Sequence, residues 1–414
     1  MGLIVQKFGG TSVANAQRIN HVADIIANTY KAGNNVIVVL SAQGDTTDDL
    51  IEKANEINPH ASRRELDMLL STGEQISVAL CAMALEKRGL PVISLAAWQV
   101  GIQTNNTYND ARIRKVGKER IQSELDKKNI VIVAGFQGVN AYGDVTTLGR
   151  GGSDTSAVAL AAAFHADLCQ IYTDVDGVYT ADPRVVPDAK KLPEITYADM
   201  LELASQGAQV LHNRSVELAK KYHVNMEVVS SMENVPGTKV KEVVKVEKTN
   251  IGGVAKMDNF VRFSLVGLED RPGVAFKVFS LLSRNSVNVD IILQSVGRDG
   301  SKDISFTCPL NSLEAAKNVL EENRDAIGYS CIEVDDHVAK ISLVGAGMMT
   351  HVGVASDMFE ALYDAGINIQ MIATSEIRIS VLVSKTDANR ALKVVHDKFF
   401  GTNSLNIALK ISKF

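Results

Sequence analysis

The stretch TTLGRGGSDTSAVALAAA, residues 146–163, decides how the first half of the chain is interpreted. It contains three glycines, Gly149, Gly151 and Gly152, which allow unusual backbone angles and close approach of a ligand. Ser153 and Asp154 are favoured at helix N-termini, and the Ala-rich run after them favours a helix. The stretch therefore predicts a glycine turn leading into a helix N-terminus, where unpaired N–H groups attract anions. An ordinary tight turn before a core helix is the alternative.

Arg150 lies inside this turn. Its planar guanidinium can hold a carboxylate or a phosphate in bidentate fashion. The stretch matches neither the Walker loop GxxxxGK[ST] nor the dinucleotide fingerprint GxGxxG. By itself it predicts an anion site without identifying the anion.

Length and composition limit the class of protein. A chain of 414 residues corresponds to roughly two to three domains. Its 46% hydrophobic and 22% charged residues are typical of a soluble globular protein. The net charge of -5 gives no reason to expect nucleic acid as a partner, and no basic cluster suggests a membrane surface. The longest apolar runs, such as residues 36–40 and 130–134, are too short to span a bilayer.

The N-terminus and the cysteines predict the compartment. MGLIVQKFGG begins directly as a strand, so no signal peptide is expected. The four cysteines are scattered among apolar neighbours without disulfide or metal-ligand spacing. We therefore expect reduced, mostly buried thiols in a cytoplasmic protein, and no protein-held metal.

The first half of the chain alternates strands and helices. Continuous apolar runs predict strands at residues 3–8, 35–40, 91–96, 130–135 and 168–173, and helical periodicity predicts helices at 13–30, 48–57 and 74–88. Strands that are apolar throughout indicate an α/β fold with a mostly parallel sheet covered by helices. Ligands of such sheets bind beyond the carboxyl ends of the strands. KFGGTS, SAQGDTT and TDVDGVY each follow a predicted strand.

The second half contains an internal repeat that begins after a boundary at residues 232–253. SLVG at 264–267 recurs at 342–345, and the VNV of 287–289 matches the INI of 367–369. Each unit follows the βαββαβ pattern, which predicts two small paired α+β domains. The expected domains are residues 1–245, 255–335 and 336–414, with the last two either sequential or interleaved.

Several residues are candidates for chemistry on local grounds. Lys7, before Gly9 and Gly10, can reach ligand phosphates, although a solvated lysine at a strand end is the alternative. Asp154 can be a plain helix N-cap, and Glu74 can simply place charge at a helix N-terminus. None of the eight histidines has a partner at catalytic or metal-ligand spacing. We therefore interpret His212 and His223 as structural residues.

A further candidate site lies at residues 173–177, TDVDG. The stretch superficially resembles a calcium loop but lacks the remaining EF-hand ligands and the closing Glu. A turn that faces a ribose or an ion is the preferred interpretation. Tyr179, Asp182 and Arg184 follow closely and could complete a nucleotide pocket.

Five motifs together resemble the aspartate kinases, which are members of the amino-acid kinase family. They are KFGGTSV at 7–13, SAQGDTTDDL at 41–50, STGE at 71–74, TLGRGGSDT at 147–155 and TDVDGVYTADPR at 173–184. The repeat, with DRPGVA and NVDI, resembles the paired ACT regulatory domains of that family. The resemblance covers essentially the whole chain in the same order. It implies ATP-dependent phosphorylation of the side-chain carboxylate of L-aspartate to 4-phospho-L-aspartate, the committed step toward lysine, threonine and methionine.

The resemblance also implies residue roles. Lys7 would bridge phosphate oxygens with Asp154 orienting it, Arg150 would hold the substrate α-carboxylate, and Glu74 its ammonium group. Hydroxyl contacts to the substrate would come from Ser41, Thr47 and Ser153. Contacts to ATP would come from Gly9, Gly10, Gly151, Gly152, Thr173, Asp174, Tyr179, Asp182, Arg184 and Gln209. Mg²⁺ is expected with ATP, held largely by phosphates and water. A carboxylate acceptor is already ionised at pH 7, so no general base is required.

Gln209 departs from the family pattern, because some members carry Lys at this position. Either the site relies more on Lys7, Arg184 and Mg²⁺, or Gln209 is peripheral. Two alternatives therefore stay open. One is another amino-acid kinase that acts on glutamate, acetylglutamate, UMP or carbamate, and the other is a non-catalytic amino-acid sensor.

The ACT resemblance implies feedback inhibition by lysine, threonine or both. The expected effector-binding residues are Asp270, Asn288, Val289, Asp290, Gln294, Met348, Asn368, Ile369 and Ser375. Because ACT domains usually pair between chains, a homodimer or higher homo-oligomer is expected. A constitutive dimerisation module is the alternative.

Overall fold

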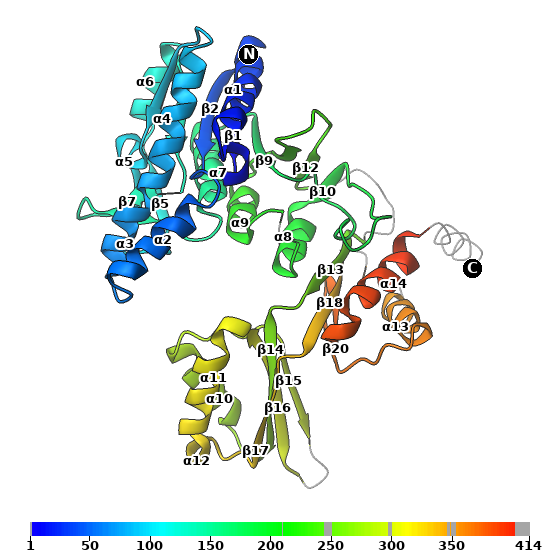
Figure 1. Cartoon of the computed structure of the whole chain (residues 1–414). Helices are drawn as coiled ribbons and strands as arrows, with labels where there is room; N and C mark the ends of the chain where they lie inside the picture. Colours follow the sequence, from blue (N-terminus) through cyan, green and yellow to red (C-terminus); the bar gives the residue numbers. More distant parts are fainter. Residues whose placement is uncertain are drawn as a thin grey trace. The chain divides into compact units, whose positions relative to one another are not determined.

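The computed structural model describes residues 2–208, 210–243, 251–296, 300–345, 348 and 353–401. Its contacts divide the chain into two compact units. Figure 1 shows the chain with colours that follow the residue numbers. The first comprises residues 1–179, 191–205 and 209–246, and the second comprises 180–190, 206–208 and 247–414. Residues 180–190 therefore pack in the second unit although they follow a strand of the first.

An eight-stranded sheet forms the centre of the first unit. Its strand order is β10 (Glu194–Thr196), β12 (Thr238–Lys241), β11 (Met226–Ser230), β9 (Leu168–Thr173), β1 (Leu3–Phe8), β2 (Asn35–Leu40), β6 (Ile130–Ala134) and β3 (Val92–Leu95). Every neighbouring pair is parallel except β11 and β12. All residues of β6 and nearly all of β2 are buried, as expected for strands covered on both faces. This confirms the predicted α/β class.

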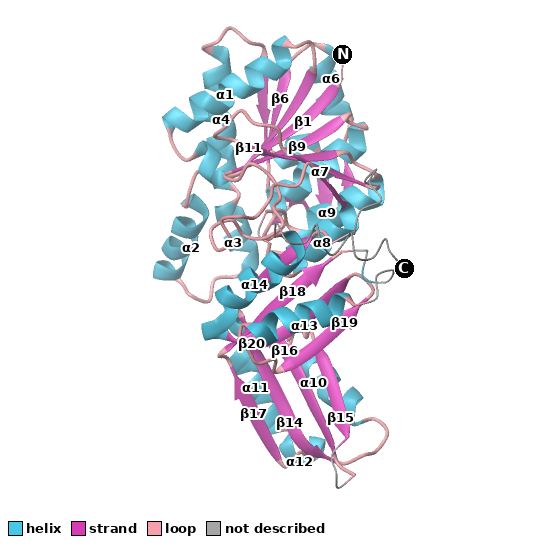
Figure 2. Cartoon of the chain, turned by 90° about the vertical axis from the view of Figure 1, so that its right-hand side faces the viewer, coloured by secondary structure: helices cyan, strands magenta, loops and turns pink. Residues whose placement is uncertain are grey.

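Helices cover both faces of this sheet, as Figure 2 shows. The helices of the first unit are α1 (Ala16–Lys31), α2 (Thr46–Ile57), α3 (Arg63–Leu70), α4 (Thr72–Glu86), α5 (Ala97–Val100), α6 (Glu119–Asp126), α7 (Gly152–Phe164), α8 (Tyr197–Ser205) and α9 (Asn213–Tyr222). α1 and α4 share a core with Val38 and Leu40 of β2, while α7 contacts β1, β2 and β9 from the other face. The helix predicted from residue 13 begins three residues later, because the Asn15 side chain caps it by accepting from the Arg18 N–H.

One helical stretch of the described chain, Arg63–Glu86, is long and apolar enough to cross a membrane. More than half of its most apolar window, 56%, is buried inside the protein. Val78, Cys81 and Leu85 of this stretch pack into the same core as α1 and β2. Its apolar side chains are thus used by the core of the first unit.

A smaller sheet brings the glycine turn to α7. Its order is β5 (Ile113–Val116), β4 (Ile102–Thr104), β7 (Gln137–Val139) and β8 (Val145–Thr147). The sequence did not predict these strands, since each has only three or four residues and several carry polar side chains. β8 ends two residues before Gly149, so the sheet determines where the turn begins.

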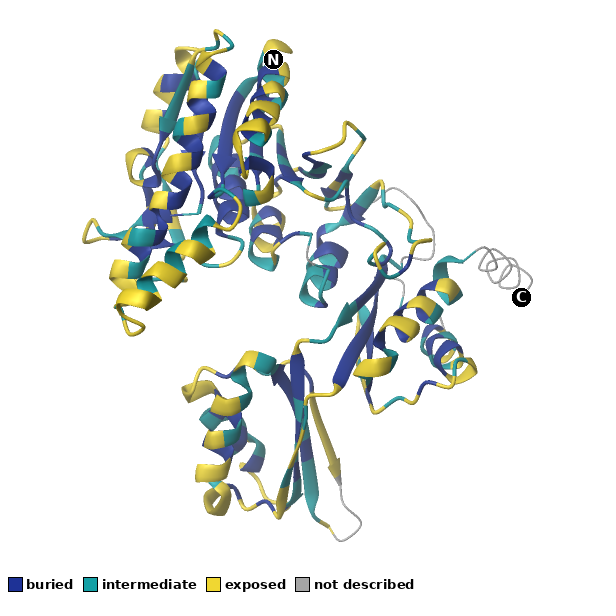
Figure 3. Cartoon of the chain, in the orientation of Figure 1, coloured by how far each residue is buried: buried dark blue, intermediate teal, exposed yellow. Residues whose placement is uncertain are grey.

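The second unit contains two four-stranded antiparallel sheets. The first has the order β15 (Ile292–Val296), β16 (Lys302–Pro309), β14 (Phe260–Leu268) and β17 (Cys331–Asp335), with helices α10 (Val274–Arg284), α11 (Leu313–Glu322) and α12 (Arg324–Ile327). Its chain order is βαββαβ apart from the extra short helix. Phe263, Leu265 and Phe306 pack against the helices, and Figure 3 shows the buried residues gathered along these strands.

The second sheet takes one strand from before the first repeat. Its order is β13 (Gly253–Met257), β18 (Val338–Val344), β20 (Arg378–Ser384) and β19 (Met371–Ser375), with helices α13 (Val354–Asp364) and α14 (Ala388–Phe400). β13 pairs with β18, with Gly253 opposite Val344. The first repeat is thus inserted between two neighbouring strands of the second sheet. The ACT boundaries 255–335 and 336–414 stay a proposal. β13 lies at the start of the first of these ranges, but it belongs to the sheet that the second range forms.

Gly151 is the position where the turn before α7 most clearly requires glycine. Its φ is 66°, in the left-handed region, and it caps α7. A Cβ added there would lie 2.2 Å from Cγ of His212, the residue that caps α9. The imidazole therefore occupies the space that any side chain at position 151 would need.

We predict that Gly151→Ala destabilises the first unit more than Gly143→Ala does. Gly143 also has a positive φ, 82°, but nothing lies within 4 Å of an added Cβ, so it measures the backbone cost alone, about 1–2 kcal/mol. Overlap with His212 adds about 1–3 kcal/mol at position 151. Urea unfolding followed by the fluorescence of Trp98, the single tryptophan, reports on this unit. Equal losses in the two variants would contradict the prediction.

Candidate active site

The carboxyl ends of four adjacent parallel strands, β9, β1, β2 and β6, meet at one edge of the large sheet. Lys7 of β1 lies beside Val39 of β2 and Ile171 of β9. The structure therefore brings the segments after residues 8, 40, 134 and 173 to one edge, where α7 also begins. This is where open parallel sheets bind ligands.

Lys7 and Asp154 form the central contact of this edge. Nζ of Lys7 lies 2.6 Å from Oδ1 of Asp154, and both side chains are only 12% exposed. Asp154 stands in the first turn of α7, where N–H groups and the helix dipole favour negative charge. The ion pair holds the ammonium close to Gly9, since a Cβ on Gly9 would lie 3.5 Å from Nζ. A fixed cation beside an open glycine backbone forms an anion-binding arrangement.

Gly10 holds the ends of β1 and β2 together. A Cβ at Gly10 would lie 2.8 Å from the Ala42 carbonyl oxygen, and the Gly44 N–H donates to the Gly10 carbonyl over 3.0 Å. Ser41 and Thr47 lie in the segment that this contact positions, and Thr47 belongs to the first turn of α2. The two hydroxyl candidates therefore lie at the same sheet edge as Lys7.

Glu74 is a buried carboxylate with one open oxygen. Its side chain is at the start of α4, and the residue is 3% exposed. Oε1 accepts from the Ala42 N–H over 3.1 Å, while Oε2 has no hydrogen-bond partner among the described residues. Burial raises the pKa of Glu74 to about 8, and the hydrogen bond from Ala42 offsets only part of this effect. A buried acceptor without a partner fits a cationic group of a ligand.

The turn at 149–152 presents Arg150 to solvent. Arg150 is exposed, and its guanidinium has no hydrogen-bond or ion-pair partner within the described part of the chain. Ser153 and Asp154 are buried directly behind it, and a Cβ at Gly135 would lie 2.7 Å from Oγ of Ser153. The turn therefore offers a free cation above a tightly packed helix start.

The segment after β9 forms a fixed acidic turn. Oγ1 of Thr173 donates to Oδ1 of Asp174 over 3.2 Å, and the Tyr179 hydroxyl donates to Oδ1 of Asp176 over 2.8 Å. Nζ of Lys191 lies 3.0 Å from Oδ2 of Asp176. Burial raises the pKa of Asp176, but the hydrogen bonds from Lys191 and Tyr179 outweigh it, so the pKa is lowered overall.

Asp182 and Arg184, which were also predicted for the nucleotide pocket, belong to the other unit. Asp182 and Arg184 pair with each other, with Nη2 of Arg184 2.9 Å from Oδ2 of Asp182, and both belong to the second unit. Gln209 lies outside the described residues. The structure thus places Thr173, Asp174 and Tyr179 in the first unit and Asp182 and Arg184 in the second.

The expected effector residues occupy equivalent places in the two repeats. Asp290 accepts a hydrogen bond from Lys340 of β18, and the repeat-equivalent Gln370 accepts one from Arg262 of β14 over 3.1 Å. A side chain of each repeat therefore donates a hydrogen bond to the segment before the second strand of the other repeat. An apolar cluster lies between them, made of Phe260, Ile291, Val338, Met371 and Leu382.

The remaining effector candidates differ in exposure. Asp270 pairs with Lys302 over 2.6 Å. Asn288, Gln294, Asn368 and Ser375 are exposed, whereas Val289, Met348 and Ile369 are partly buried against their own cores. The two repeats thus expose the same polar position, Asn288 in one and Asn368 in the other.

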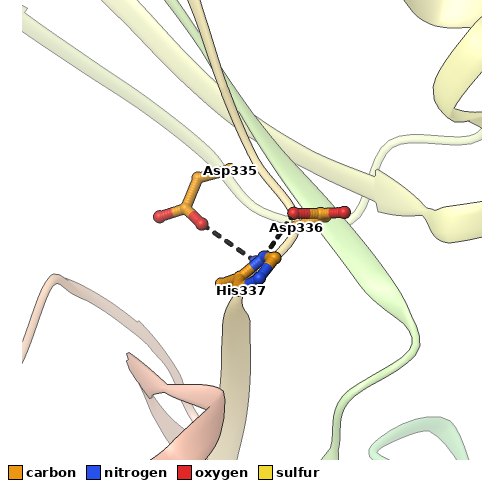
Figure 4. Close-up of side chains that lie close together, drawn as sticks. All are labelled: Asp335, Asp336 and His337. Carbon is orange, nitrogen blue, oxygen red and sulfur yellow. Dashed lines mark hydrogen bonds and ion pairs between the residues drawn. The ribbon is translucent and has the colours of Figure 1, made fainter.

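Asp335, Asp336 and His337 lie together where β17 is followed by β18, as Figure 4 shows. The His337 N–H donates to Oδ1 of Asp335 over 2.9 Å, and Nδ1 of His337 lies 2.5 Å from Oδ1 of Asp336. The hydrogen bond from His337 lowers the pKa of Asp336. The side chains of Asp336 and His337 are exposed and satisfy each other, as in an ordinary polar turn.

Sequence reasoning missed three charged residues that the structure connects to the active-site edge. Asp67 is fully buried, Arg214 reaches the chain before the glycine turn, and Lys191 holds Asp176. Asp67 and Arg214 lie in ordinary amphipathic helices, so their spacing gave no signal. The one feature that could have singled out Asp67 is its place as an acid in the otherwise apolar stretch LDMLL.

Comparisons with known proteins agree with this geometry. The model of the amino acid kinase family matches residues 2–230, and ACT domain models match residues 264–326 and 341–399. An aspartokinase of Mycolicibacterium smegmatis is 49% identical over 405 residues, covering 96% of each chain.

Solved structures give the same result. E. coli aspartokinase III in complex with aspartate and ADP is 27% identical with a TM-score of 0.82, over 96% of this chain and 100% of that one. The same enzyme with lysine and aspartate is 28% identical with a TM-score of 0.75, over 96% and 99%. The chain described here belongs to the aspartokinases, ATP-using enzymes of the amino acid kinase family that carry ACT domains.

Proposed function

We propose that this enzyme transfers the γ-phosphoryl group of ATP to the side-chain carboxylate of L-aspartate, giving 4-phospho-L-aspartate for lysine, threonine and methionine synthesis. The observation that carries the proposal is the Lys7–Asp154 ion pair at the strand ends, beside the unpartnered buried oxygen of Glu74. The E. coli relative that binds aspartate and ADP supports this pairing of ligands. Aspartate has two carboxylates and one ammonium, which match one fixed anion site, one exposed arginine and one buried acid.

The proposed roles follow from charge and position. Lys7 binds phosphate oxygens, and Gly9, Gly10, Gly151 and Gly152 let the phosphates approach the main chain closely because they carry no side chains. Arg150 binds the α-carboxylate, and Glu74 binds the ammonium. Ser41, Thr47 and Ser153 add hydroxyl contacts to the substrate. Thr173, Asp174 and Tyr179 contact the nucleotide, with Asp182, Arg184 and Gln209 as further candidates.

The chemistry requires positioning more than proton transfer. An ionised carboxylate attacks without a general base, so the protein must align the reactants and stabilise charge on the transferring group. Mg²⁺, which neutralises phosphate charge, would be held mainly by ATP and water.

The first test is ADP release with L-aspartate, and with glutamate, acetylglutamate, UMP and carbamate as rival acceptors. Aspartate alone should support turnover.

Lys7→Ala should lower kcat by about 100- to 1,000-fold, since it removes a fixed charge at the transferring phosphoryl group. Asp154→Ala should lower it by about 10-fold or more by releasing Lys7. The surface variant Lys31→Ala is the control. Wild-type rates in both site variants would support the non-catalytic sensor instead.

Glu74 predicts a pH dependence of aspartate binding. Below pH about 8 the buried carboxyl of the free enzyme is protonated, so binding of the ammonium must release a proton. The KM for aspartate should therefore fall as the pH rises toward 8, by up to about tenfold per unit, and level off above it. Glu74→Gln should show a raised KM without this slope. The KM for ATP is the control, and a flat wild-type KM for aspartate below pH 8 would refute the assignment.

We also propose that the ACT units bind lysine, threonine or both as feedback inhibitors, between paired chains of a cytoplasmic homodimer or larger homo-oligomer. The E. coli relative solved with lysine supports this. The candidate effector contacts are Asp270, Asn288, Val289, Asp290, Gln294, Met348, Asn368, Ile369 and Ser375. Exposed Asn288 and Asp290 near the contact between the repeats offer an amide and a carboxylate to an amino acid.

The effector proposal predicts inhibition by lysine or threonine, added singly and together. Coupling of about 1–3 kcal/mol would change the apparent affinity for substrate by about 5- to 150-fold. Asp290→Asn keeps a hydrogen-bond acceptor for Lys340 but removes the charge, so it should weaken inhibition without changing uninhibited kcat. Asp325→Asn, on the short helix α12 of the same repeat, is the control. Absence of any effect of either amino acid on activity or Tm would leave the dimerisation module as the better explanation.

A further inference from the structure

Arg214 of α9 reaches into the chain that carries the glycine turn. Its Nη1 donates to the carbonyl of Leu148 over 2.7 Å, and its Nη2 donates to the carbonyl of Ala111 over 2.5 Å. The side chain is 13% exposed. One guanidinium therefore bridges two segments that are far apart in sequence, and one of its two acceptors is two residues before Arg150.

Asp67 of α3 holds the same two segments through a different set of groups. Its carboxylate accepts from the Thr147 N–H over 2.8 Å, the Thr147 hydroxyl over 2.6 Å and the Asn109 N–H over 3.0 Å. The Ala111 N–H also donates to the Thr147 carbonyl over 2.9 Å. Residues 109–111 and 147–148 are thus held together by hydrogen bonds to the buried carboxylate of Asp67 and to the guanidinium of Arg214.

The glycine turn at residues 149–152 continues directly from residues 147–148 and packs against Asn109. A Cβ on Gly149 would lie 2.8 Å from the carbonyl oxygen of Asn109. Arg150 itself is exposed, and nothing among the described residues holds its guanidinium. Its direction is therefore set by the backbone of the turn, which starts from Leu148. A shift of the Leu148 carbonyl would move Arg150.

We propose that Arg214 is a positioning residue for the substrate, which acts by fixing the backbone from which Arg150 binds the α-carboxylate of aspartate. Asp67 fixes the same segment through Thr147. The inference rests on the proposed role of Arg150. Arginine suits this task because its planar fork donates to two carbonyls at once, whereas a lysine ammonium is a single point charge on a flexible stem.

Arg88 provides a matched control because it is bonded in a similar way. It donates to the carbonyls of Ala84 and Asn20 over 2.7 and 2.9 Å, and to the carboxylate of Asp24 over 2.7 Å. It follows the C-terminal end of α4, whereas Glu74 stands at the beginning of that helix, roughly 20 Å away along the helix axis. If Arg214 served only to stabilise the fold, its substitution should affect stability and KM as substitution of Arg88 does.

The experiment compares Arg214→Met, Arg214→Lys, Arg88→Met, Arg150→Ala and the double variant Arg150→Ala/Arg214→Met. Arg214→Met should raise the KM for aspartate about 10-fold or more, leave the KM for ATP within about twofold, and have no further effect on the KM for aspartate when Arg150 is already alanine. Arg214→Lys should recover part of the affinity. Arg88→Met should lower Tm without changing either KM.

Three outcomes would overturn the proposal. An aspartate KM that rises equally in the wild-type and Arg150→Ala backgrounds would show that Arg214 acts independently of Arg150. Parallel losses for aspartate and ATP, in proportion to Tm, would show a general structural role, and Arg214→Lys decides this if Arg214→Met does not fold. An unchanged KM in Arg150→Ala alone would remove the proposed role of Arg150, and the positioning proposal with it.

Discussion

The largely buried ion pair between Lys7 and Asp154 joins the first strand of the large sheet to the N-terminus of α7. A charged pair with little solvent around it is stable only if its geometry is fixed and its environment supplies further polar partners. Here the parallel strands supply the geometry, because β9, β1 and β2 end at one edge. The start of α7 supplies oriented N–H groups beside the acid. Ser41 follows β2, Thr173 ends β9 and Ser153 lies in the first turn of α7, so these candidate contacts lie at the same edge as the pair.

The same edge distributes charge in a way that suits an amino acid with two carboxylates and one ammonium, together with a triphosphate. Lys7 is restrained by its partner, while Arg150 is free and directed only by its backbone. Glu74 is buried with one unsatisfied oxygen, so a ligand ammonium completes a hydrogen-bonding deficit that already exists in the free protein. In the proposed roles, binding of aspartate is coupled to a proton at Glu74 and to the rigidity of the chain before Arg150. These are two separate physical controls on one substrate.

The second unit is built on approximate internal symmetry that is broken in two places. Arg262 reaches Gln370 as Lys340 reaches Asp290, but only one of these contacts pairs two charges. β13 also completes the second sheet from a position before the first repeat. The sequence repeat revealed both α+β units, yet it contained no sign of this exchange. Strand pairing between segments about 90 residues apart leaves no local pattern.

By itself the sequence predicted five strands of the large sheet, at residues 3–8, 35–40, 91–96, 130–135 and 168–173, together with the repeat and the motifs at the strand ends. These features depend on local periodicity and on residue types that few other contexts favour, such as the glycines around Lys7 and Arg150. The small sheet, the strands β10, β11 and β12, and the contacts of Asp67 and Arg214 were decided only by the tertiary structure, whereas α1 begins where it does because of the local Asn15 cap. Asp67 and Arg214 function through backbone groups of residues 109–111 and 147–148, and a hydrogen bond to a backbone carbonyl or N–H requires nothing particular of the partner's side chain. Such contacts are therefore invisible in one sequence, although they fix the turn with which the sequence analysis began.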